Sequence, residues 1–189
     1  MSTVPVNGFI LAGGKSSRMG RDKALLDWHG RALVSHMTHI LETVTDEVQV
    51  VGRDPLPDRV PGRGPLSGIA TALEVSSTDA NLILAVDLPF LTKDFLLYFR
   101  SLIESTSRRL FACKIGSHFP LCLGVRKALL PEIERLLLSE DRSLHGWITA
   151  SDAEILSEAQ LKSTGFDATI FRNLNTPEDY EKEIRGLPS

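Results

Sequence analysis

Two short stretches of the chain, residues 9–12 and 81–86, are apolar almost without interruption. Residues 47–51 are expected to form a further short strand. Continuous apolar runs of this length are typical of parallel strands that are covered on both faces. The pattern therefore predicts a sheet whose central strands are buried on both sides.

Between and after these runs the apolar residues recur at helical spacing. Leu33, Val34, Met37, Ile40, Leu41 and Val44 follow the i, i+1, i+4, i+7, i+8, i+11 pattern of one helix face. The same period predicts helices that begin near Pro65 and Thr92 and a third over residues 129–137. Thr176 followed by Pro177 predicts a closing helix over residues 177–184, because a Thr cap with Pro at the first helical position is a common helix start.

Two late extended runs, residues 110–115 and 119–125, are joined by Gly116-Ser117-His118, which suits a hairpin. A last strand is expected near residues 169–171. Strands that alternate with helices indicate an α/β fold. We expect a Rossmann-like three-layer α/β/α sandwich with a mostly parallel central sheet and a late antiparallel hairpin. Ligands bind at the carboxyl ends of strands in such sheets.

Length and composition narrow the function classes. With 189 residues, 42% hydrophobic and 24% charged, the chain suits a single domain over residues 1–189. A net charge of −3 argues against nucleic-acid binding. No apolar segment approaches the roughly 20 residues that span a membrane, and no leader is evident, so a cytoplasmic location is expected. Cys113 and Cys122 are interpreted as reduced core residues.

The segment that follows the first apolar run is rich in glycine and in cationic residues. Residues 13–23 hold three glycines and four cationic side chains, an arrangement that suits an anion. A solvated turn is the alternative, but it would not need so many cations. Gly14 and Gly20 enclose five residues where a Walker A loop has four, and the adjacent Gly13 and Gly14 do not fit the dinucleotide G-x-G-x-x-G pattern. The segment predicts a phosphate-binding loop of another class.

The motifs Leu11-Ala12-Gly13-Gly14, Ser17-Arg18-Met19-Gly20 and Asp22-Lys23 resemble the signature of nucleotidyltransferases with a glycosyltransferase-A-like fold. Among these the chain is most similar to molybdenum cofactor guanylyltransferases of the MobA type. The resemblance implies transfer of GMP from GTP to molybdenum-molybdopterin, with pyrophosphate released and Mg²⁺ as cofactor. A CTP-dependent cytidylyltransferase, a sugar-phosphate nucleotidyltransferase and a non-catalytic GTP-binding protein remain alternatives.

The resemblance also implies roles for single residues. Lys23 and Arg18 are expected on the nucleotide phosphates, and the three catalytic candidates are Lys23, Arg18 and Asp87. Asp87 follows an uncharged strand, where a carboxylate needs a cationic partner, and the family has an Mg²⁺-binding Asp there. The alternatives are a surface lysine at position 23 and an Asp that caps the turn before Pro89. The acceptor supplies the attacking oxygen, so no Ser, Cys or His nucleophile is needed.

The expected nucleotide site includes a second glycine segment. Gly64-Pro65-Leu66-Ser67-Gly68 resembles the family's G-P-L-x-G motif near the base and ribose, although it could be a simple turn. The family's polar residue after the preceding strand matches only Gly52 or Arg53. The L-A-G-G form of the first motif points to GTP, because cytidylyltransferase relatives tend to carry L-A-A-G. The nucleotide-binding candidates are Leu11, Ala12, Gly13, Gly14, Lys23, Asp58, Gly64, Pro65 and Asp87.

The acceptor side is expected near the end of the chain. Asn173 and Asn175 lie in a segment that resembles the family's N-x-N-T-P-E-D motif, implicated on the pterin side. Alternatively, an Asn ends a strand there and Thr176 only caps the next helix. Pro120-Leu121-Cys122 and Arg126 resemble the stretch that borders the acceptor pocket.

Overall fold

The structure is a computed structural model that describes residues 4–13, 22–140 and 142–185. Within these residues a six-stranded sheet has the order β4-β1-β5-β7-β6-β8. The strands are β1 (Val6–Leu11), β4 (Glu47–Val51), β5 (Ala80–Ala85), β6 (Leu110–Lys114), β7 (Cys122–Arg126) and β8 (Ala153–Ser157). β7 pairs antiparallel with β5 and β6, whereas the β1–β4, β1–β5 and β6–β8 pairs are parallel. The mostly parallel sheet and its late antiparallel hairpin are thus confirmed.

The central strands are apolar throughout because both faces of the sheet are covered. Phe9 and Ile10 are adjacent and both fully buried, yet they belong to different core clusters. Successive residues of a strand point to opposite faces, so a strand between two cores needs apolar residues at every position.

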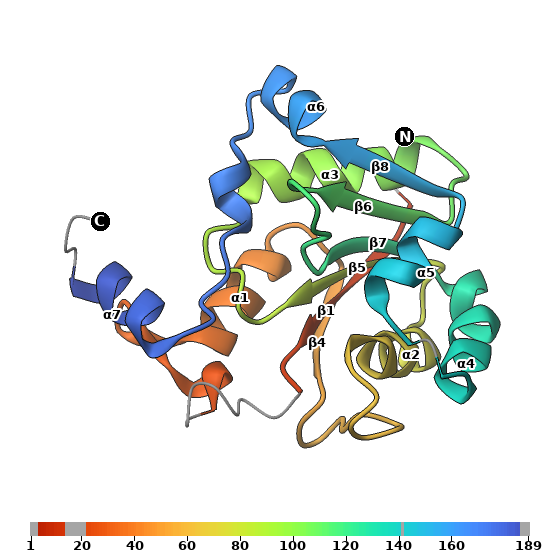
Figure 1. Ribbon diagram of the computed structural model, residues 1–189, viewed down its shortest axis with the longest axis horizontal. Helices are drawn as coiled ribbons and strands as arrows, with labels where there is room; N and C mark the ends of the chain where they lie inside the picture. Colours follow the sequence, from red (N-terminus) through yellow and green to blue (C-terminus); the bar gives the residue numbers. More distant parts are fainter. Residues whose placement is uncertain (1–3, 14–21, 141, 186–189) are drawn as a thin grey trace.

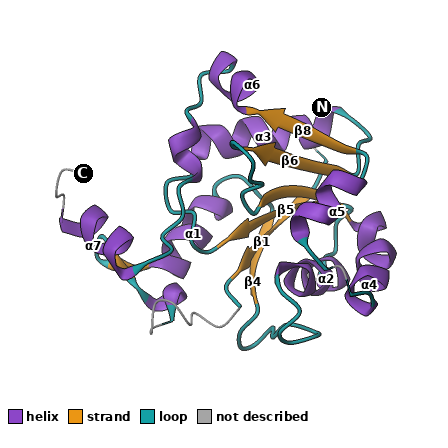
Figure 2. Ribbon diagram, in the orientation of Figure 1, coloured by secondary structure: helices purple, strands orange, loops and turns teal. Residues whose placement is uncertain are grey.

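Helices cover both faces (Figures 1 and 2). One face packs against α1 (Leu33–Glu42) and α3 (Lys93–Ser105), and the other against α2 (Pro65–Val75), α4 (Leu130–Leu138) and α5 (Leu144–Ala150). α6 (Glu158–Ser163) and α7 (Pro177–Arg185) follow. The three-layer α/β/α arrangement agrees with the sequence pattern. None of the helices in the described ranges combines the length and apolar character that a bilayer crossing requires.

The strand expected near residues 169–171 is not formed. Residues 168–171 form a 3₁₀ turn, η3 (Ala168–Phe171), in which the Asp167 side chain accepts a hydrogen bond from the N–H of Thr169. Phe171 packs against Phe95 with ring centroids 5.0 Å apart. The prediction of a strand here was wrong because an Asp cap favours a helical turn and one buried aromatic anchors it.

The segment after the glycine loop holds elements that the apolar pattern does not indicate. A short 3₁₀ helix, η1 (Lys23–Leu25), precedes a small hairpin of β2 (Asp27–Trp28) and β3 (Arg31–Ala32). Its turn uses positive φ at His29 and Gly30, as a tight type I′ turn requires. The Tyr180 hydroxyl of α7 donates to the carbonyl of Asp27, which places α7 beside this hairpin (Figure 1).

The two cysteines are free and buried in the core. Burial raises the pKa of Cys113 to about 12, so its thiol stays protonated at neutral pH. This agrees with their interpretation as reduced core residues.

Candidate functional site

Three parallel strands bring the expected site residues to one edge of the sheet. The N–H of Val86, after β5, donates to the carbonyl of Leu11 over 3.1 Å, and the N–H of Ala12 donates to the carbonyl of Val51 over 2.8 Å. Gly13, Gly52 and Asp87 therefore follow neighbouring strands at the same carboxyl edge. The structure confirms that the start of the glycine loop and the mid-chain aspartate lie together.

Four predicted residues from three distant parts of the chain are in direct contact. Lys23 Nζ lies 3.1 Å from Asp87 Oδ2 and donates to Asn175 Oδ1 over 3.3 Å. Asn173 Nδ2 donates to the other carboxylate oxygen, Asp87 Oδ1, over 3.3 Å. The Lys23 and Asp87 side chains are only 18% and 17% exposed. The pair is thus partly shielded from water, which strengthens its electrostatic attraction.

Local capping positions the lysine. The Asp22 side chain accepts a hydrogen bond from the N–H of Ala24 over 3.0 Å and so caps η1, in which Lys23 is the first residue. An Asp at this position satisfies a donor at the start of the turn and fixes the direction of the chain.

A reciprocal cap and a buried leucine position the two asparagines. The Asp179 carboxylate accepts from the N–H groups of Thr176 and Asn175, and the Thr176 hydroxyl accepts from the N–H of Asp179. Leu174 lies between the asparagines, is 1% exposed, and donates its N–H to the carbonyl of Asp87. Because Leu174 points into the core, its neighbours Asn173 and Asn175 are exposed on the site side.

Asp87 is the described carboxylate best placed to hold a metal ion. The described ranges contain no group of three or more His, Cys, Asp or Glu side chains that could hold one. A single carboxylate fits Mg²⁺, which prefers one or two protein carboxylates and completes its shell with substrate oxygens and water. The donor set therefore suits a divalent ion that is bound together with a phosphate.

Gly13 and Gly52 bring two backbones into contact beside Asp58. A Cβ on Gly13 would lie 2.8 Å from Gly52 Cα and 2.9 Å from Asp58 Oδ2. Gly52 has φ +92°, and a Cβ there would lie 2.4 Å from Gly13 Cα. Asp58 thus lies against the start of the glycine loop, and burial raises the pKa of its carboxyl group.

The loop that carries Asp58 is tied to α2. The N–H of Arg59 donates to the Thr71 hydroxyl over 2.9 Å, and the N–H of Val60 donates to the Ser67 hydroxyl over 3.1 Å. Gly64 (φ +71°) precedes α2, and Pro65 is its first residue. Leu66 is fully buried, which anchors the helix start against the sheet.

A family model for the MobA-like NTP transferase domain matches residues 8–155. The chain belongs to this family.

Individual relatives match the MobA-like chain over most of its length. It is 34% identical over 185 residues to a probable molybdenum cofactor guanylyltransferase of Carboxydothermus hydrogenoformans, with 93% of each chain covered. It is 32% identical to a molybdenum cofactor guanylyltransferase of Syntrophotalea carbinolica, with 95% of this chain and 90% of the relative covered.

Solved structures share the fold. The molybdopterin-guanine dinucleotide biosynthesis protein A of Archaeoglobus fulgidus superposes with a TM-score of 0.76 at 20% identity, covering 95% of this chain and 98% of that one. A manganese complex of Rv0371c from Mycobacterium tuberculosis superposes with a TM-score of 0.68 at 12% identity, covering 97% and 100%.

Some expected residues of this MobA-like domain lie elsewhere or outside the described ranges. Gly14 and Arg18 fall outside the described residues. The carbonyl of Leu121 accepts from the N–H of Ala85 over 2.8 Å, so this part of the expected acceptor stretch lies beside the site. Arg126 does not: it pairs with Ala80 at the opposite end of β5 and donates to the carbonyl of Ile103. Its expected place was wrong because β7 runs antiparallel.

Two contacts beside the site were not predicted. Arg53 Nη2 lies 2.8 Å from Asp22 Oδ2, which connects the end of β4 to the cap of η1. His36 Nε2 lies 3.1 Å from the carbonyl oxygen of Pro89 and so holds the turn that follows Asp87. The charges of Arg53 and Asp22 are visible in the sequence, but only the fold shows that these two side chains meet.

The Gly13–Gly52 contact predicts that any side chain at position 13 destabilises the fold. Gly13→Ala should lower the free energy of unfolding by about 1–3 kcal/mol, because its Cβ overlaps backbone atoms of Gly52 that cannot move independently. Denaturant unfolding of the purified variant measures this cost. Gly52→Ala should cost more, since its φ of +92° is also unfavourable for alanine. Wild-type stability in both variants would contradict the contact.

Proposed function

We propose that this chain transfers GMP from GTP to the terminal phosphate of molybdenum-molybdopterin, releasing pyrophosphate. The contact of Lys23 with Asp87 and Asn175, at the sheet edge where Gly13 also lies, is the observation that carries this proposal. Relatives at 34% and 32% identity are named molybdenum cofactor guanylyltransferases, which supports the choice of donor and acceptor.

In the proposed reaction an oxygen of the acceptor phosphate forms a bond to the α-phosphorus of GTP. The bond from the α-phosphorus to the bridging oxygen breaks, and its electron pair leaves with pyrophosphate. The chain needs no covalent nucleophile, so its part is alignment of the two substrates and stabilisation of negative charge.

In this proposal Lys23 stabilises charge on the α-phosphate, and Asp87 binds the metal ion. The Lys23 ammonium is a compact cation on a flexible stem, so it can move from Asp87 towards an α-phosphate oxygen as charge develops there. Asp87 would hold Mg²⁺, which neutralises phosphate charge and orients the triphosphate when it is bound. Asn173 and Asn175 then face the acceptor from the other side of the pair.

The choice of GTP is argued from Gly13 and Asp58. The Gly13–Gly52 contact leaves no room for the alanine that cytidylyltransferase relatives carry at position 13. An ionised Asp58 beside Gly13 offers acceptors for the N–H donors on the edge of a guanine ring. Leu11, Ala12, Gly64 and Pro65 would complete the nucleotide side in this proposal, together with Gly14 and Arg18.

The proposal treats residues 1–189 as one nucleotidyltransferase domain that works in the cytoplasm with Mg²⁺. Its partners would be GTP and the pterin acceptor, without nucleic acid or membrane.

The direct test incubates the protein with GTP, Mg²⁺ and molybdenum-loaded pterin. We expect guanine dinucleotide and one pyrophosphate for each GTP consumed, scored by chromatography and a coupled pyrophosphate assay. Parallel reactions with CTP, or with sugar phosphates as acceptors, should be slow. Faster turnover in either reaction would replace the proposed substrates, and GTP that binds but is never consumed would indicate a non-catalytic protein.

Lys23→Ala and Asp87→Ala should each lower kcat/KM by roughly 100-fold or more, because each removes a charge that stabilises the transferring phosphate. Steady-state kinetics measure this loss, and circular dichroism checks the fold. Lys162→Ala on α6 and Asp152→Ala on the surface remove the same charges far from the site and should retain wild-type rates. Full activity in Lys23→Ala or Asp87→Ala would exclude the assigned role.

Asp58 predicts a pH dependence of GTP binding. Because its pKa is raised, Asp58 becomes protonated at a higher pH than an ordinary carboxyl group of pKa about 3.9. GTP affinity should fall as the pH drops through this raised pKa, since a protonated Asp58 accepts fewer hydrogen bonds. Asp58→Asn should bind GTP roughly 10- to 100-fold more weakly at neutral pH.

Calorimetry of wild type and Asp58→Asn across pH 4–8 measures this dependence. The wild-type to Asp58→Asn affinity ratio should shrink towards acid pH, whereas Asp152→Asn should keep the wild-type profile. A constant ratio would show that Asp58 does not titrate against bound nucleotide.

A further inference from the structure

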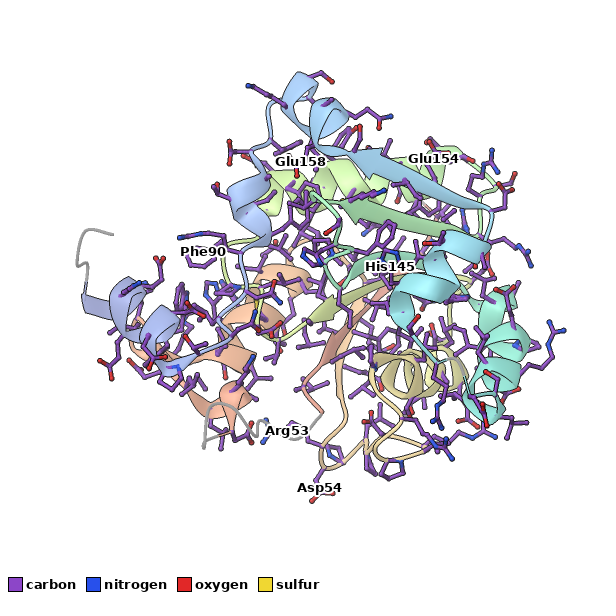
Figure 3. All side chains as sticks on the ribbon, viewed as in Figure 1. Arg53, Asp54, Phe90, His145, Glu154 and Glu158 are labelled. Atoms are coloured by element: carbon purple, nitrogen blue, oxygen red, sulfur yellow. The ribbon has the colours of Figure 1, made fainter. Side chains whose placement is uncertain are left out.

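Arg53 is the first residue after β4 whose side chain can reach the site. Gly52 precedes it and is held against Gly13, so position 52 offers no side chain to a ligand. Figure 3 shows Arg53 extending towards the segment that begins at Asp22, while Asp54 points away from the molecule. The tight turn after it is closed by hydrogen bonds from Leu56 to Arg53 and from Gly52 to Leu56.

One nitrogen of the Arg53 guanidinium is already used. Nη2 donates to Asp22 Oδ2 over 2.8 Å, with the two side chains 28% and 46% exposed. Asp22 uses its other oxygen to cap η1, where Lys23 begins. The guanidinium group is therefore fixed next to the lysine that we assign to the phosphates.

The second terminal nitrogen of Arg53 has no acceptor in the part of the chain that the structure describes. Nη1 is buried and has no hydrogen-bond partner among the residues that the structure describes, where it is the one buried side-chain N or O atom in this condition. A guanidinium cannot neutralise itself by losing a proton, so the unmet donor keeps its charge. A buried donor without a partner is unfavourable, so Nη1 is available to an acceptor that a ligand at the neighbouring site would supply.

The order of strands indicates which ligand atoms could accept a hydrogen bond from Arg53 Nη1. Since β1 lies between β4 and β5, Gly13 has Arg53 on one flank and Asp87 on the other. A triphosphate bound beside Gly13 between them would present anionic oxygens to both flanks. The planar fork of arginine binds such oxygens while a second nitrogen keeps its own partner.

We propose that Arg53 is a further nucleotide-binding residue of this chain, with Nη1 donating to a phosphate oxygen of the nucleoside triphosphate while Nη2 holds Asp22. This inference rests on the proposed function, which it deepens by adding a residue to the phosphate site. The bound triphosphate and Lys23 are then linked through Arg53 and Asp22.

A purely structural role makes a different prediction. If Arg53 only held Asp22 in place, loss of either partner would affect ligand binding alike. If Nη1 binds phosphate, Arg53→Ala weakens binding more than Asp22→Asn does, because the Asn side-chain oxygen can still cap η1 and position Lys23. The pair of variants therefore separates the two roles.

The experiment measures binding of GTP, tripolyphosphate and guanosine by calorimetry to wild type, Arg53→Ala, Arg53→Lys and Asp22→Asn. Arg53→Ala should bind GTP and tripolyphosphate roughly 10- to 100-fold more weakly, with guanosine affinity unchanged. Arg53→Lys can still pair with Asp22 and should fold like wild type in thermal unfolding, yet bind tripolyphosphate roughly 5-fold more weakly or worse. It keeps the test valid if Arg53→Ala is unstable.

Unchanged tripolyphosphate affinity in the Arg53 variants would overturn the inference. So would equal weakening of guanosine, which would place Nη1 on the base, or equal weakening by Asp22→Asn, which would make the role structural. Tripolyphosphate carries no base, so this arm tests Arg53 whichever nucleoside triphosphate is used. Failure of wild type to bind GTP would instead count against the proposed function.

Discussion

The site depends on the ion pair between Lys23 and Asp87, which lie 64 positions apart in the chain. Asp87 is fixed by the central strand β5, while Lys23 lies on a three-residue 3₁₀ helix with little core of its own. The pair joins this weakly anchored segment to the rigid sheet. Asn173 and Asn175 add a bond to each partner, so the end of the chain is joined to the same point.

Removal of either Lys23 or Asp87 would be unfavourable for the side chain that remains. The side chains of this pair are mostly shielded from water, so removal of one would leave the other charge poorly solvated. In the proposed function, a phosphate would replace Asp87 as the partner of Lys23, and a metal ion would replace Lys23 as the partner of Asp87.

The glycine contact on the other flank follows from the parallel strand order. β1 and β4 end side by side, and their chains continue past the sheet edge in contact at Gly13 and Gly52. No Cβ fits at either position, because each would overlap the backbone of the other residue. Neither glycine has a side chain, so the side chains nearest this contact are those of Asp58 and Arg53. The pKa of Asp58 is raised, and Arg53 Nη1 has no hydrogen-bond partner among the described residues.

The sequence by itself determined the layers and the edge at which the site lies. Apolar runs at 9–12 and 81–86 are typical of parallel strands that are covered on both faces, and parallel strands end at a common edge. A family resemblance predicted roles for Lys23, Asp87, Asn173 and Asn175, and the structure brings these four side chains into contact. The local pattern failed near residues 169–171, where an Asp cap and one buried ring outweighed extended character. The resemblance failed at Arg126, which lies at the end of β7 away from the site. The pairing of Arg53 with Asp22 and the contact of Gly13 with Gly52 were decided only by the tertiary structure, since which charges and which glycines meet depends on strand order and on turns that bring distant segments within bonding distance.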